Sequence, residues 1–391
     1  MKTVGILGAG QLGLLLSQSI ARLGGRCLVF DPDTKAPAHA HCLKSFPYPF
    51  QDREKLLEFF KESDVITYEF EHLPIEPLEE IQSKLRPSLK VLETTGNRLL
   101  EKRFLKENGF PLADFLEIES DGNAEEKLRG FGLPAMVKTV SGGYDGKGQF
   151  RLSQESELSA FLAIVKSGLK PITFVAERLL PISLEVSCIV ARQGKKNVTM
   201  PIFENVHERS ILDTTVFPSD IDDKTAAAVE RIAVEIAEAL DLCGILTVEF
   251  FLVEKDGGKA YDIYVNELAP RPHNSGHLSM NAMNVSQFDL LARILLDLPF
   301  EAPRAISGDY FAMSNLLGDL WFDDEGKILS LDFAQLVSSE HFVDLVLYGK
   351  TEPRANRKMG HIVVRGRTLE EAMNNSMELR AMLNPKAFCQ R

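Results

Sequence analysis

The first 95 residues alternate short apolar runs with a segment of helical spacing, and this alternation constrains the fold more than any other feature. The apolar runs Thr3–Leu7, Cys27–Phe30 and Val65–Tyr68 have the length and composition of buried strands. Between the first two runs, the apolar residues of Leu12–Leu23 recur at the spacing of one helix face. Strand, helix and strand in this order form a βαβ unit with parallel strands. We therefore predict an α/β protein that begins with a Rossmann-like parallel-sheet domain.

Three further blocks follow, so the expected domains are 1–95, 96–178, 179–300 and 301–391. The second block begins with a helix and places short strands around a glycine-rich loop. The third has longer strands of antiparallel character and a helix at Lys224–Leu240, and the fourth, small C-terminal block ends in a helix from Leu369. The strands expected in these blocks are Ala135–Lys138, Thr173–Glu177, Leu184–Arg192, Val198–Phe203, Leu246–Val253, Lys259–Val265, Phe311–Leu317, Val343–Tyr348 and His361–Arg365.

A glycine-rich turn, Gly8-Ala9-Gly10-Gln11-Leu12-Gly13, joins the first strand to the first helix. With Asp31 at the end of the next strand, it satisfies the dinucleotide-binding pattern, in which a helix N-terminus holds an anion. The physics requires only an anion or a close backbone approach at that N-terminus. On these residues alone, a nicotinamide- or flavin-dependent enzyme is an open alternative.

A second glycine-rich segment, Gly142–Gln149, follows a strand that ends at Lys138. Such a segment suits a lid that becomes ordered over a phosphate, and the ammonium of Lys138 can meet that phosphate as a point charge. The segment is not a Walker loop, because Gly148 stands where a magnesium-binding Ser or Thr belongs. A flexible surface hairpin with solvated lysines is the alternative interpretation.

Two acidic residues, Glu249 and Glu267, lie on apolar strands that a tight turn at Gly257-Gly258 joins, so we expect them to be neighbours. Two carboxylates in a buried sheet repel each other unless a cation lies between them. Magnesium bound to nucleotide phosphates is the natural cation, and Asn266 offers a further oxygen. Alternatively, one of the two acids faces solvent and pairs with Lys or Arg.

Two polar segments predict anion sites. In Asn266–His277, prolines forbid regular structure and present several polar groups on a loop, among them His273 and His277, which we expect to bind an anion. The cluster Lys350, Arg354, Arg357 and Lys358 suits the phosphate of a substrate, although a solvated basic turn would look similar.

The composition narrows the class of protein. The net charge of −12, from 44 basic and 56 acidic residues, argues against a nucleic-acid-binding surface. The five cysteines form no Cys-x-x-Cys pair, which favours reduced thiols in the cytoplasm. We find no leader and no apolar run of membrane-spanning length, so we expect no membrane association.

The motifs, taken in order, resemble one family. The succession of Lys138, the glycine-rich loop, an acidic strand end, Glu249 and Asn266-Glu267 is similar to that of ATP-grasp enzymes. Within that superfamily, the ordered set resembles the N5-carboxyaminoimidazole ribonucleotide synthases of purine biosynthesis over nearly the whole chain. The motifs that carry this resemblance are the Gly8–Gly13 turn, Thr67-Tyr68-Glu69-Phe70-Glu71, Gly143–Gln149, Asn266–His277, Tyr348-Gly349-Lys350 and Arg357–His361.

The resemblance implies an ATP-grasp fold with a Rossmann-like N-terminal domain and a small C-terminal domain. It also implies a cytoplasmic homodimeric ligase that uses ATP, Mg²⁺ and bicarbonate to carboxylate the exocyclic amine of 5-aminoimidazole ribonucleotide (AIR), through carboxyphosphate. A lid would protect that intermediate from water.

The resemblance also implies roles for individual residues. Asp145, Tyr144 and Arg271 would be catalytic, with Asp145 as the candidate base, and Glu249 and Glu267 would bind the metal. The residues implied to bind ATP are Arg98, Lys138, Gly143, Tyr144, Asp145, Gly146, Lys147, Gly148, Gln149, Glu177, Arg178, Leu179, Leu180, Glu185, His207, Asn266 and Glu267, with 177–180 as the strand edge that meets adenine. Those implied to bind AIR are Glu69, Tyr144, Asp145, Arg271, Lys350, Arg357 and Lys358, with Gln11 as a further candidate. Those implied to bind bicarbonate or phosphate are Arg271, His273 and Asn274.

Two other functions remain open from the sequence. Another ATP-grasp ligase, such as a formate-using glycinamide ribonucleotide transformylase or a biotin carboxylase, would share the ATP residues but differ in the lid and in the Lys350–His361 segment. A nicotinamide-dependent dehydrogenase would use the first block and leave Lys138, Glu249 and Glu267 without a role.

Overall fold

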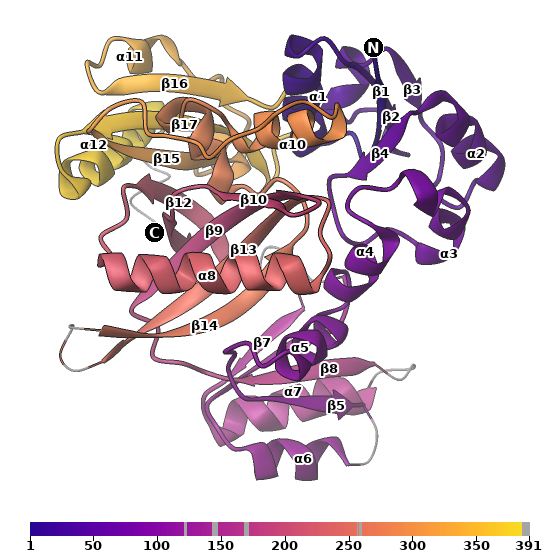
Figure 1. The fold of residues 1–391 in the computed structure, drawn as a ribbon. Helices are drawn as coiled ribbons and strands as arrows, with labels where there is room; N and C mark the ends of the chain where they lie inside the picture. Colours follow the sequence, from indigo (N-terminus) through magenta and orange to yellow (C-terminus); the bar gives the residue numbers. More distant parts are fainter. Residues whose placement is uncertain (121–122, 143–147, 168–171, 256, 258–259, 385–391) are drawn as a thin grey trace.

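The computed structural model describes residues 1–120, 123–142, 148–167, 172–255, 257 and 260–384, which form three sheets with helices packed against them (Figure 1). The first sheet is parallel, in the order β3-β2-β1-β4, as the βαβ pattern predicts. Its strands are β1 (Thr3–Leu7), β2 (Arg26–Phe30), β3 (Lys44–Phe46) and β4 (Val65–Tyr68). The helices of this region are α1 (Gln11–Arg22), η1 (Pro37–His41), α2 (Arg53–Glu62), α3 (Ile75–Leu78), η2 (Glu79–Lys84) and α4 (Leu89–Thr95).

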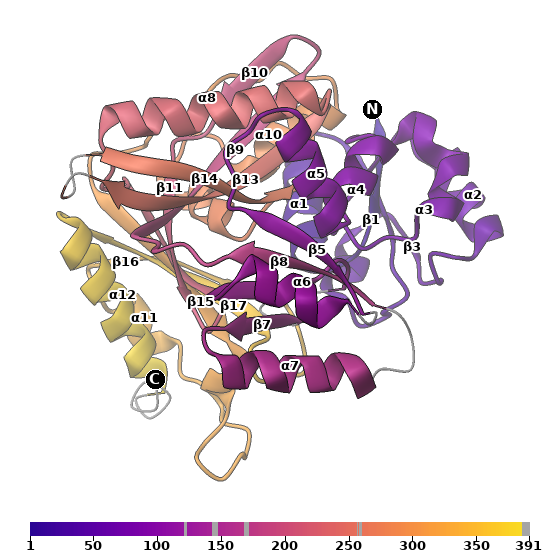
Figure 2. The same cartoon turned by 90° about the horizontal axis from the view of Figure 1, so that it is seen from below.

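A small antiparallel sheet, in the order β5-β8-β6-β7, forms the lobe at the bottom of Figure 1. Helices α6 (Ala124–Phe131) and α7 (Glu155–Ser167) pack on the sheet, and their apolar residues form one core with it (Figure 2). The strands are β5 (Phe115–Glu119), β6 (Ala135–Thr139), β7 (Gln149–Leu152) and β8 (Thr173–Arg178). Helix α5 (Arg98–Glu107) precedes this small lobe, and the side chain of Asn97 caps its N-terminus.

The third sheet has nine strands and runs through the expected boundary near residue 300. Its order is β14-β13-β9-β11-β12-β15-β17-β16, with β10 paired to β9. Its strands are β9 (Leu184–Gln193), β10 (Lys196–Thr199), β11 (Phe203–Glu208), β12 (Ile211–Phe217), β13 (Gly244–Lys255), β14 (Ala260–Ala269), β15 (Tyr310–Leu317), β16 (Phe342–Leu347) and β17 (Lys358–Gly366). The pairing of β12 with β15 joins the third expected block to the fourth.

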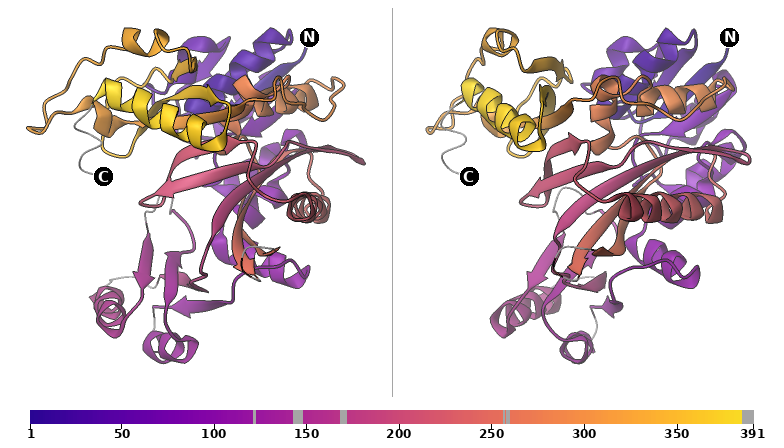
Figure 3. Two further views of the ribbon diagram at one scale, coloured as in Figure 1. Left: turned by 90° about the vertical axis from the view of Figure 1, so that its left-hand side faces the viewer. Right: turned by 60° about the vertical axis from the view of Figure 1, so that its left-hand side comes forward.

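Helices cover both faces of this large sheet (Figure 3). Helix α8 (Asp223–Ala239) packs on β9 and β13 through a core that includes Val229 and Ile236. On the other face, α10 (Gln287–Leu295) contacts both the sheet and α1, so a single core joins the N-terminal domain to the large sheet. The remaining helices are η3 (Ser275–Leu278), α9 (Ser279–Ala282), η4 (Gly318–Trp321), α11 (Ala334–Val337) and α12 (Leu369–Leu383).

One predicted strand is wrong. The segment Val198–Phe203 contains the end of β10 and the start of β11 rather than one strand. Pro201 lies between the two strands, and a proline has no N–H to donate to a sheet. Within the described ranges, none of the helices combines the length and the apolar character that a membrane crossing needs.

Candidate active site

A cleft with a cavity volume of about 1020 Å³ lies where the three sheets meet. The turn after β1, the small lobe, the large sheet and the segment after β16 all contribute to its walls. The predicted site residues that line it are Gln11, Glu69, Arg98, Lys138, Gln149, Glu177, Arg178, Leu179, Leu180, Glu185, His207, Glu249, Asn266, Glu267, Arg271, His273, Asn274, Lys350 and Lys358.

The other predicted residues do not line the cleft or are not described. Gly143, Tyr144, Asp145, Gly146 and Lys147 lie outside the described residues. Gly148 precedes β7, and Arg357 donates from its guanidinium to the carbonyl of Glu352 at 2.7 Å.

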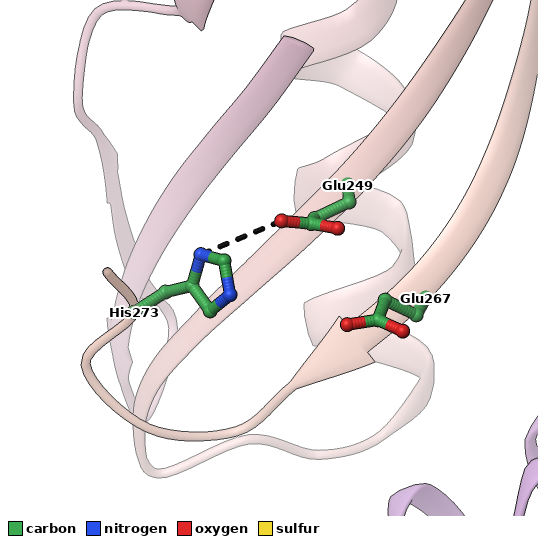
Figure 4. Close-up of side chains that lie close together, drawn as sticks. All are labelled: Glu249, Glu267 and His273. Carbon is green, nitrogen blue, oxygen red and sulfur yellow. Dashed lines mark ion pairs between the residues drawn. The ribbon is translucent and has the colours of Figure 1, made fainter. Parts of the chain in front are cut away.

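The paired acids Glu249 and Glu267 lie opposite each other in the register of β13 and β14, as predicted. With His273 they form a group whose candidate ligand atoms all lie within 4.8 Å of one another (Figure 4). Within the described part of the chain, neither acid forms an ion pair with Lys or Arg, and Glu249 Oε1 accepts no hydrogen bond. These two carboxylates suit a divalent cation. Mg²⁺ prefers oxygen ligands, so we regard His273 as a neighbour of that site rather than a ligand.

The protonation of this group supports a cation site. Burial and the nearby charge of Glu267 raise the pKa of Glu249 to about 7. Burial, with help from Arg271 and Lys358, lowers the pKa of His273 well below its usual value. The imidazole is therefore neutral near pH 7, so it supplies no positive charge to the Glu249 carboxylate that lies 3.5 Å away.

A buried cluster of charges lies between the small lobe and the large sheet. The carboxylate of Glu177 is 3.1 Å from Lys138 Nζ and 3.4 Å from Lys102 Nζ. Burial alone would raise the pKa of Glu177, but Lys102, Lys138 and Arg98 outweigh it and lower the pKa to about 2. Burial lowers the pKa of Lys138, and Lys102 and Arg98 add to that effect while Glu177 opposes it. The excess of cations in this cluster suits phosphate groups.

The predicted adenine edge needs a correction. Strand β8 is an inner strand, because Glu177 pairs with Phe115 of β5 on one side and with Met136 of β6 on the other. Glu177 and Arg178 are therefore not at a sheet edge, and only Leu179 and Leu180 follow the paired region.

Glu185 and His207 contact each other on β9 and β11. The distance from His207 Nδ1 to Glu185 Oε2 is 2.8 Å. Burial works to lower the pKa of His207, but Glu185, Glu249 and Glu267 outweigh it and the pKa is raised. Glu185, whose carboxylate can accept hydrogen bonds from hydroxyl groups, therefore lines the same cleft as Glu249 and Glu267.

A chain of buried hydrogen bonds supports the loop after β14. Thr215 donates to Asn205 Oδ1 at 3.0 Å, and Asn205 Nδ2 donates to Ser187 at 3.0 Å. Ser187 donates to Ser275 at 2.8 Å, and the Ser275 hydroxyl lies 3.0 Å from His273 Nδ1. The backbone N–H of Ser275 also donates to Nδ1, so Nδ1 is an acceptor and the imidazole proton belongs on Nε2.

The interpretation of His277 as an anion ligand is wrong. Its imidazole is fully buried and packs against Phe288, Tyr348 and His361 rather than lining the cleft. Its Nδ1 accepts from the amide of Gln287, which also holds the backbone of the loop. His277 therefore belongs to the core beneath the site.

The glycine-rich turn after β1 already holds an anion. The carboxylate of Glu69 accepts hydrogen bonds from the backbone N–H groups of Gly10 and Gly13 at the N-terminus of α1. A Cβ on Gly8 would lie 2.3 Å from Glu69 Cγ, so this position requires glycine. Asp31 accepts from the N–H of Ala9 at 2.8 Å. Both features of the dinucleotide pattern are thus used within the chain itself.

The basic segment after β16 reaches the cleft from the C-terminal side. Lys350 Nζ donates to Gln11 Oε1 at 2.8 Å and to the carbonyl of Lys358 at 2.6 Å. Arg271 approaches from the loop after β14 and binds Glu71, with Nε 2.8 Å from Oε1. Lys350, Lys358 and Arg271, which the sequence predicts to bind anions, therefore all line the cleft.

Family comparisons cover most of the chain in three parts. The ribonucleotide synthetase preATP-grasp domain matches residues 1–94, and the ATP-grasp domain matches residues 103–288. The phosphoribosylaminoimidazole carboxylase C-terminal domain matches residues 312–375.

Curated relatives and solved structures agree with these matches. The chain is 35% identical to the N5-carboxyaminoimidazole ribonucleotide synthase of Staphylococcus aureus over 367 residues, which is 93% of this chain and 92% of the relative. The chain belongs to the N5-carboxyaminoimidazole ribonucleotide synthase family. A crystal structure of the Staphylococcus aureus synthetase with ADP has a TM-score of 0.85 at 31% identity, and covers 97% of each chain. The Aspergillus clavatus synthase, in complex with ADP and 5-aminoimidazole ribonucleotide, has a TM-score of 0.82 at 28% identity, with 98% of this chain and 99% of that chain covered.

Membership of this synthase family confirms the resemblance and the fold class predicted from the sequence. The ATP-grasp fold has a preATP-grasp domain before it and a C-terminal domain after it. The dehydrogenase alternative is wrong, because the turn on which it rested belongs to the preATP-grasp domain and is filled by Glu69. As a family of synthetases, these proteins are ATP-grasp ligases.

Three buried residues at the site of this synthase-family protein were given no role from the sequence. Glu71 binds Arg271, whereas Glu101 and Lys102 contact the backbone beside Glu267. Arg98, Glu101 and Lys102 stand at positions i, i+3 and i+4 of one helix, which places them on one face. Because Arg98 was predicted, that spacing was the signal that could have identified Glu101 and Lys102.

Proposed function

We propose that the protein catalyses the ATP-dependent carboxylation of AIR by bicarbonate, giving N5-carboxyaminoimidazole ribonucleotide, ADP and phosphate. One observation carries the proposal. A single cleft contains the paired acids Glu249 and Glu267. The same cleft contains two groups of cations that could bind phosphate, one around Lys138 and the other formed by Lys350 and Lys358. Such a cleft fits a nucleotide and a second phosphorylated substrate, and the Aspergillus clavatus relative has ADP and 5-aminoimidazole ribonucleotide bound.

At the nucleotide end, Arg98 and Lys138 are proposed to bind the phosphates of ATP. Glu185, held by His207 at 2.8 Å, is proposed to accept hydrogen bonds from the ribose hydroxyls. Leu179 and Leu180 follow the paired part of β8, and we propose that this segment meets adenine. The other proposed ATP residues are Gly143, Tyr144, Asp145, Gly146, Lys147, Gly148, Gln149, Glu177, Arg178, Asn266 and Glu267.

We propose that Glu249 and Glu267 bind Mg²⁺, with Asn266 beside them. The fit rests on the two facing carboxylates and on two oxygens, Glu249 Oε1 and Asn266 Oδ1, that accept no hydrogen bond from the described residues. When bound, Mg²⁺ would neutralise charge that develops on the transferring phosphoryl group. Both carboxyl groups must be ionised to hold it.

The reaction is proposed to occur in two steps. An oxygen of bicarbonate attacks the γ-phosphorus of ATP, and the bond to the bridging oxygen breaks with ADP as the leaving group, which gives carboxyphosphate. The exocyclic nitrogen of AIR then attacks the carboxyl carbon, or carbon dioxide released from it in the closed site, and phosphate leaves. A base takes the amine proton, and Asp145 is the proposed base.

At the other end of the cleft, Lys350, Lys358 and Arg357 are proposed to bind the phosphate of AIR, with Glu69, Tyr144, Asp145 and Gln11 contacting the rest of the molecule. The ion pair of Arg271 with the buried Glu71 holds the guanidinium at the wall of the cleft, which supports a role for Arg271 in binding an anion. We propose that Arg271, His273 and Asn274 bind bicarbonate. Asn274 lines the cleft, and the buried nitrogen and oxygen of its side-chain amide have no hydrogen-bond partner within the described ranges.

The assembly and the compartment are parts of the same proposal. A homodimer is expected from the resemblance, and sedimentation of the purified protein tests it. The four cysteines in the described part of the chain are free thiols, which supports the cytoplasm as the compartment.

The experiment that tests the function measures ADP release in the presence of ATP, Mg²⁺ and bicarbonate, with and without AIR. We expect ADP to form only when AIR is present, and labelled bicarbonate to enter the product in equal amount. ADP release that does not depend on AIR would contradict the proposal. Glycinamide ribonucleotide with formate serves as a control substrate pair, and turnover of that pair would favour another ATP-grasp ligase.

A further inference from the structure

The strand that carries Glu267 lies at the edge of the large sheet. Strand β14 pairs with β13 on one side, and the other side has no strand partner among the described residues. The register shifts beside the site, because Glu249 faces Glu267 whereas Phe250 faces Val265. Asn266 is therefore the extra residue of a β-bulge, and a bulge redirects the neighbouring side chain at the expense of regular pairing. The backbone that sets the direction of Glu267 thus needs support from outside the sheet.

Two adjacent residues of α5 provide that support. Lys102 Nζ donates to the carbonyl of Asn266 at 2.7 Å, and Glu101 Oε2 accepts from the N–H of Leu268 at 3.0 Å. These are the backbone groups immediately before and after Glu267. The helix side chains therefore bind the outer edge of the strand on both sides of that residue.

Packing of the helix does not require these two polar residues. Leu105 of α5 is fully buried in the core beneath the large sheet, and Phe104 packs against the same core. Lys102 and Glu101 are only 1% and 4% exposed, and burying such groups is costly unless they are bonded. Apolar residues would dock the helix at a lower cost, so the polar contacts must serve the backbone they bind.

Lys102 also connects the two lobes. Its Nζ lies 3.4 Å from Glu177 Oε2 on β8 while it donates to Asn266 on β14. The same ammonium thus contacts the strand proposed to lead to adenine and the strand that carries the proposed metal ligand. A displacement of either strand would lengthen one of the two contacts.

We propose that Glu101 and Lys102 are positioning residues for Glu267: they hold the bulged edge of β14 so that the Glu267 carboxylate faces Glu249, and Lys102 keeps that edge in register with the small lobe. This inference rests on the proposed role of Glu267 as a metal ligand. Neither residue touches the reacting atoms, so both act through the strand. Their loss should weaken the Mg²⁺-dependent part of nucleotide binding.

The test uses equilibrium binding of ADP to the full-length protein by calorimetry, with Mg²⁺ and with EDTA. Glu101→Leu removes the acceptor for Leu268 N–H, whereas Glu101→Gln keeps a carbonyl oxygen there. We expect Glu101→Leu to weaken MgADP binding about tenfold, the size of one lost buried hydrogen bond, with metal-free ADP affinity within about twofold of the wild type. Glu101→Gln should restore most of the MgADP affinity.

Lys102→Met is the second variant, and it should weaken MgADP binding more than metal-free ADP binding. Glu107→Leu and Lys106→Met, at exposed positions of the same helix, are the matched controls and should change neither affinity. Equal losses with and without Mg²⁺ in both Glu101→Leu and Lys102→Met would overturn the inference, as would unchanged MgADP affinity. The unfolding temperature of each variant shows whether it is folded. If Glu101→Leu is misfolded, the MgADP and metal-free ADP affinities of Lys102→Met test the inference.

ADP binding needs neither AIR nor bicarbonate, so this result is independent of the test of the overall reaction. A protein that fails to use AIR but shows the Mg²⁺-specific loss would contradict the proposed substrate and support the positioning role. A protein that uses AIR but shows no Mg²⁺-specific loss in the variants would support the proposed substrate and contradict the positioning role.

Discussion

Lys350 donates a hydrogen bond to Gln11 at 2.8 Å, although the two residues are 339 positions apart in the chain. The contact joins the segment after β16 to the glycine-rich turn of the first domain. It closes one end of the cleft with a cation that the first domain orients. Lys350 is thus held ready for an anion instead of being a freely solvated surface lysine.

Replacing Lys350 by alanine should weaken AIR binding much more than ATP binding. Loss of a charge-assisted contact to phosphate should raise the KM for AIR by about tenfold or more, while the KM for ATP changes little. Steady-state kinetics with each substrate varied in turn measures this difference. Lys35→Ala is the matched control, since Lys35 forms an exposed ion pair with Glu352 nearby. Equal losses for AIR and ATP would reassign the basic segment.

Glu267→Gln should leave the fold intact and abolish ADP formation. The substitution keeps the shape of the side chain but removes the negative charge that a Mg²⁺ ligand supplies. We expect ADP release to fall by at least about a hundredfold, of the order seen when an important electrostatic contact to a transition state is removed. The circular dichroism spectrum should remain that of the wild type. Glu254→Gln, at an exposed position of the neighbouring strand, is the control, and normal turnover in Glu267→Gln would exclude the metal role.

The metal-free protein should lose stability as the pH rises from weakly acidic to weakly basic values. Burial raises the pKa of Glu249 and of Glu69 to about 7, and that of Glu101 to about 8, from 4.5 in the unfolded chain. In this range the folded state binds protons that the unfolded chain has released, so the free energy of unfolding decreases as pH increases. The folded-state pKa values near 7 and 8 mark the upper end of the window.

Glu249→Gln should flatten this dependence, by at most about 1.4 kcal/mol per pH unit for one proton. Urea unfolding in EDTA at several pH values above about 6.5 measures this dependence. Below that pH, His273 and His277 take up protons in the unfolded chain but not in the folded protein, because burial lowers their pKa values. These two histidines would therefore make stability increase with pH and would oppose the effect of Glu249. Parallel curves for the wild type and the variant would show that Glu249 ionises normally in the folded protein.

Gly8→Ala should destabilise the protein more than Gly24→Ala. Both glycines have positive φ, +106° and +82°, so both substitutions carry left-handed strain of about 1–2 kcal/mol. Only at Gly8 would the new Cβ also collide with Glu69, whereas no described atom lies within 4 Å at Gly24. Displacing Glu69 from the Gly10 and Gly13 amides should cost about 1–3 kcal/mol more. Urea denaturation compares the two variants, and equal losses would mean that the carboxylate is not tightly held.

Local patterns were sufficient for the parts of the site that lie on regular strands. Glu249 and Glu267 could be placed as neighbours because both strands had clear apolar composition and a glycine turn joined them. The order of motifs then identified the family. Composition alone was not sufficient at Pro201. We expected this residue to lie within a strand, whereas one strand ends before it and the next begins after it.

Contacts between distant segments could not be predicted from one sequence. Lys102 meets Asn266 across 164 residues, and Glu69 fills a turn 59 residues away from it. The bulge at Asn266 decides which backbone groups face α5, and it became visible only from the pairing of β14 with β13. His277 was misread for the same reason, because its burial depends on Phe288 and His361.

The unbroken large sheet has a mechanical consequence. Hydrogen bonds run from β14, which carries Glu267, through β12 and β15 to β17, which begins at Lys358. A hydrogen-bonded sheet resists shear, so these two ends of the cleft travel together as a stiff frame. The small lobe has a separate sheet in the described structure, and Lys102, which contacts Glu177 of that lobe and the carbonyl of Asn266, links it to this frame. The distance between the two ends of the cleft is thus set by one sheet, whereas the position of the small lobe depends on side-chain contacts such as those of Lys102.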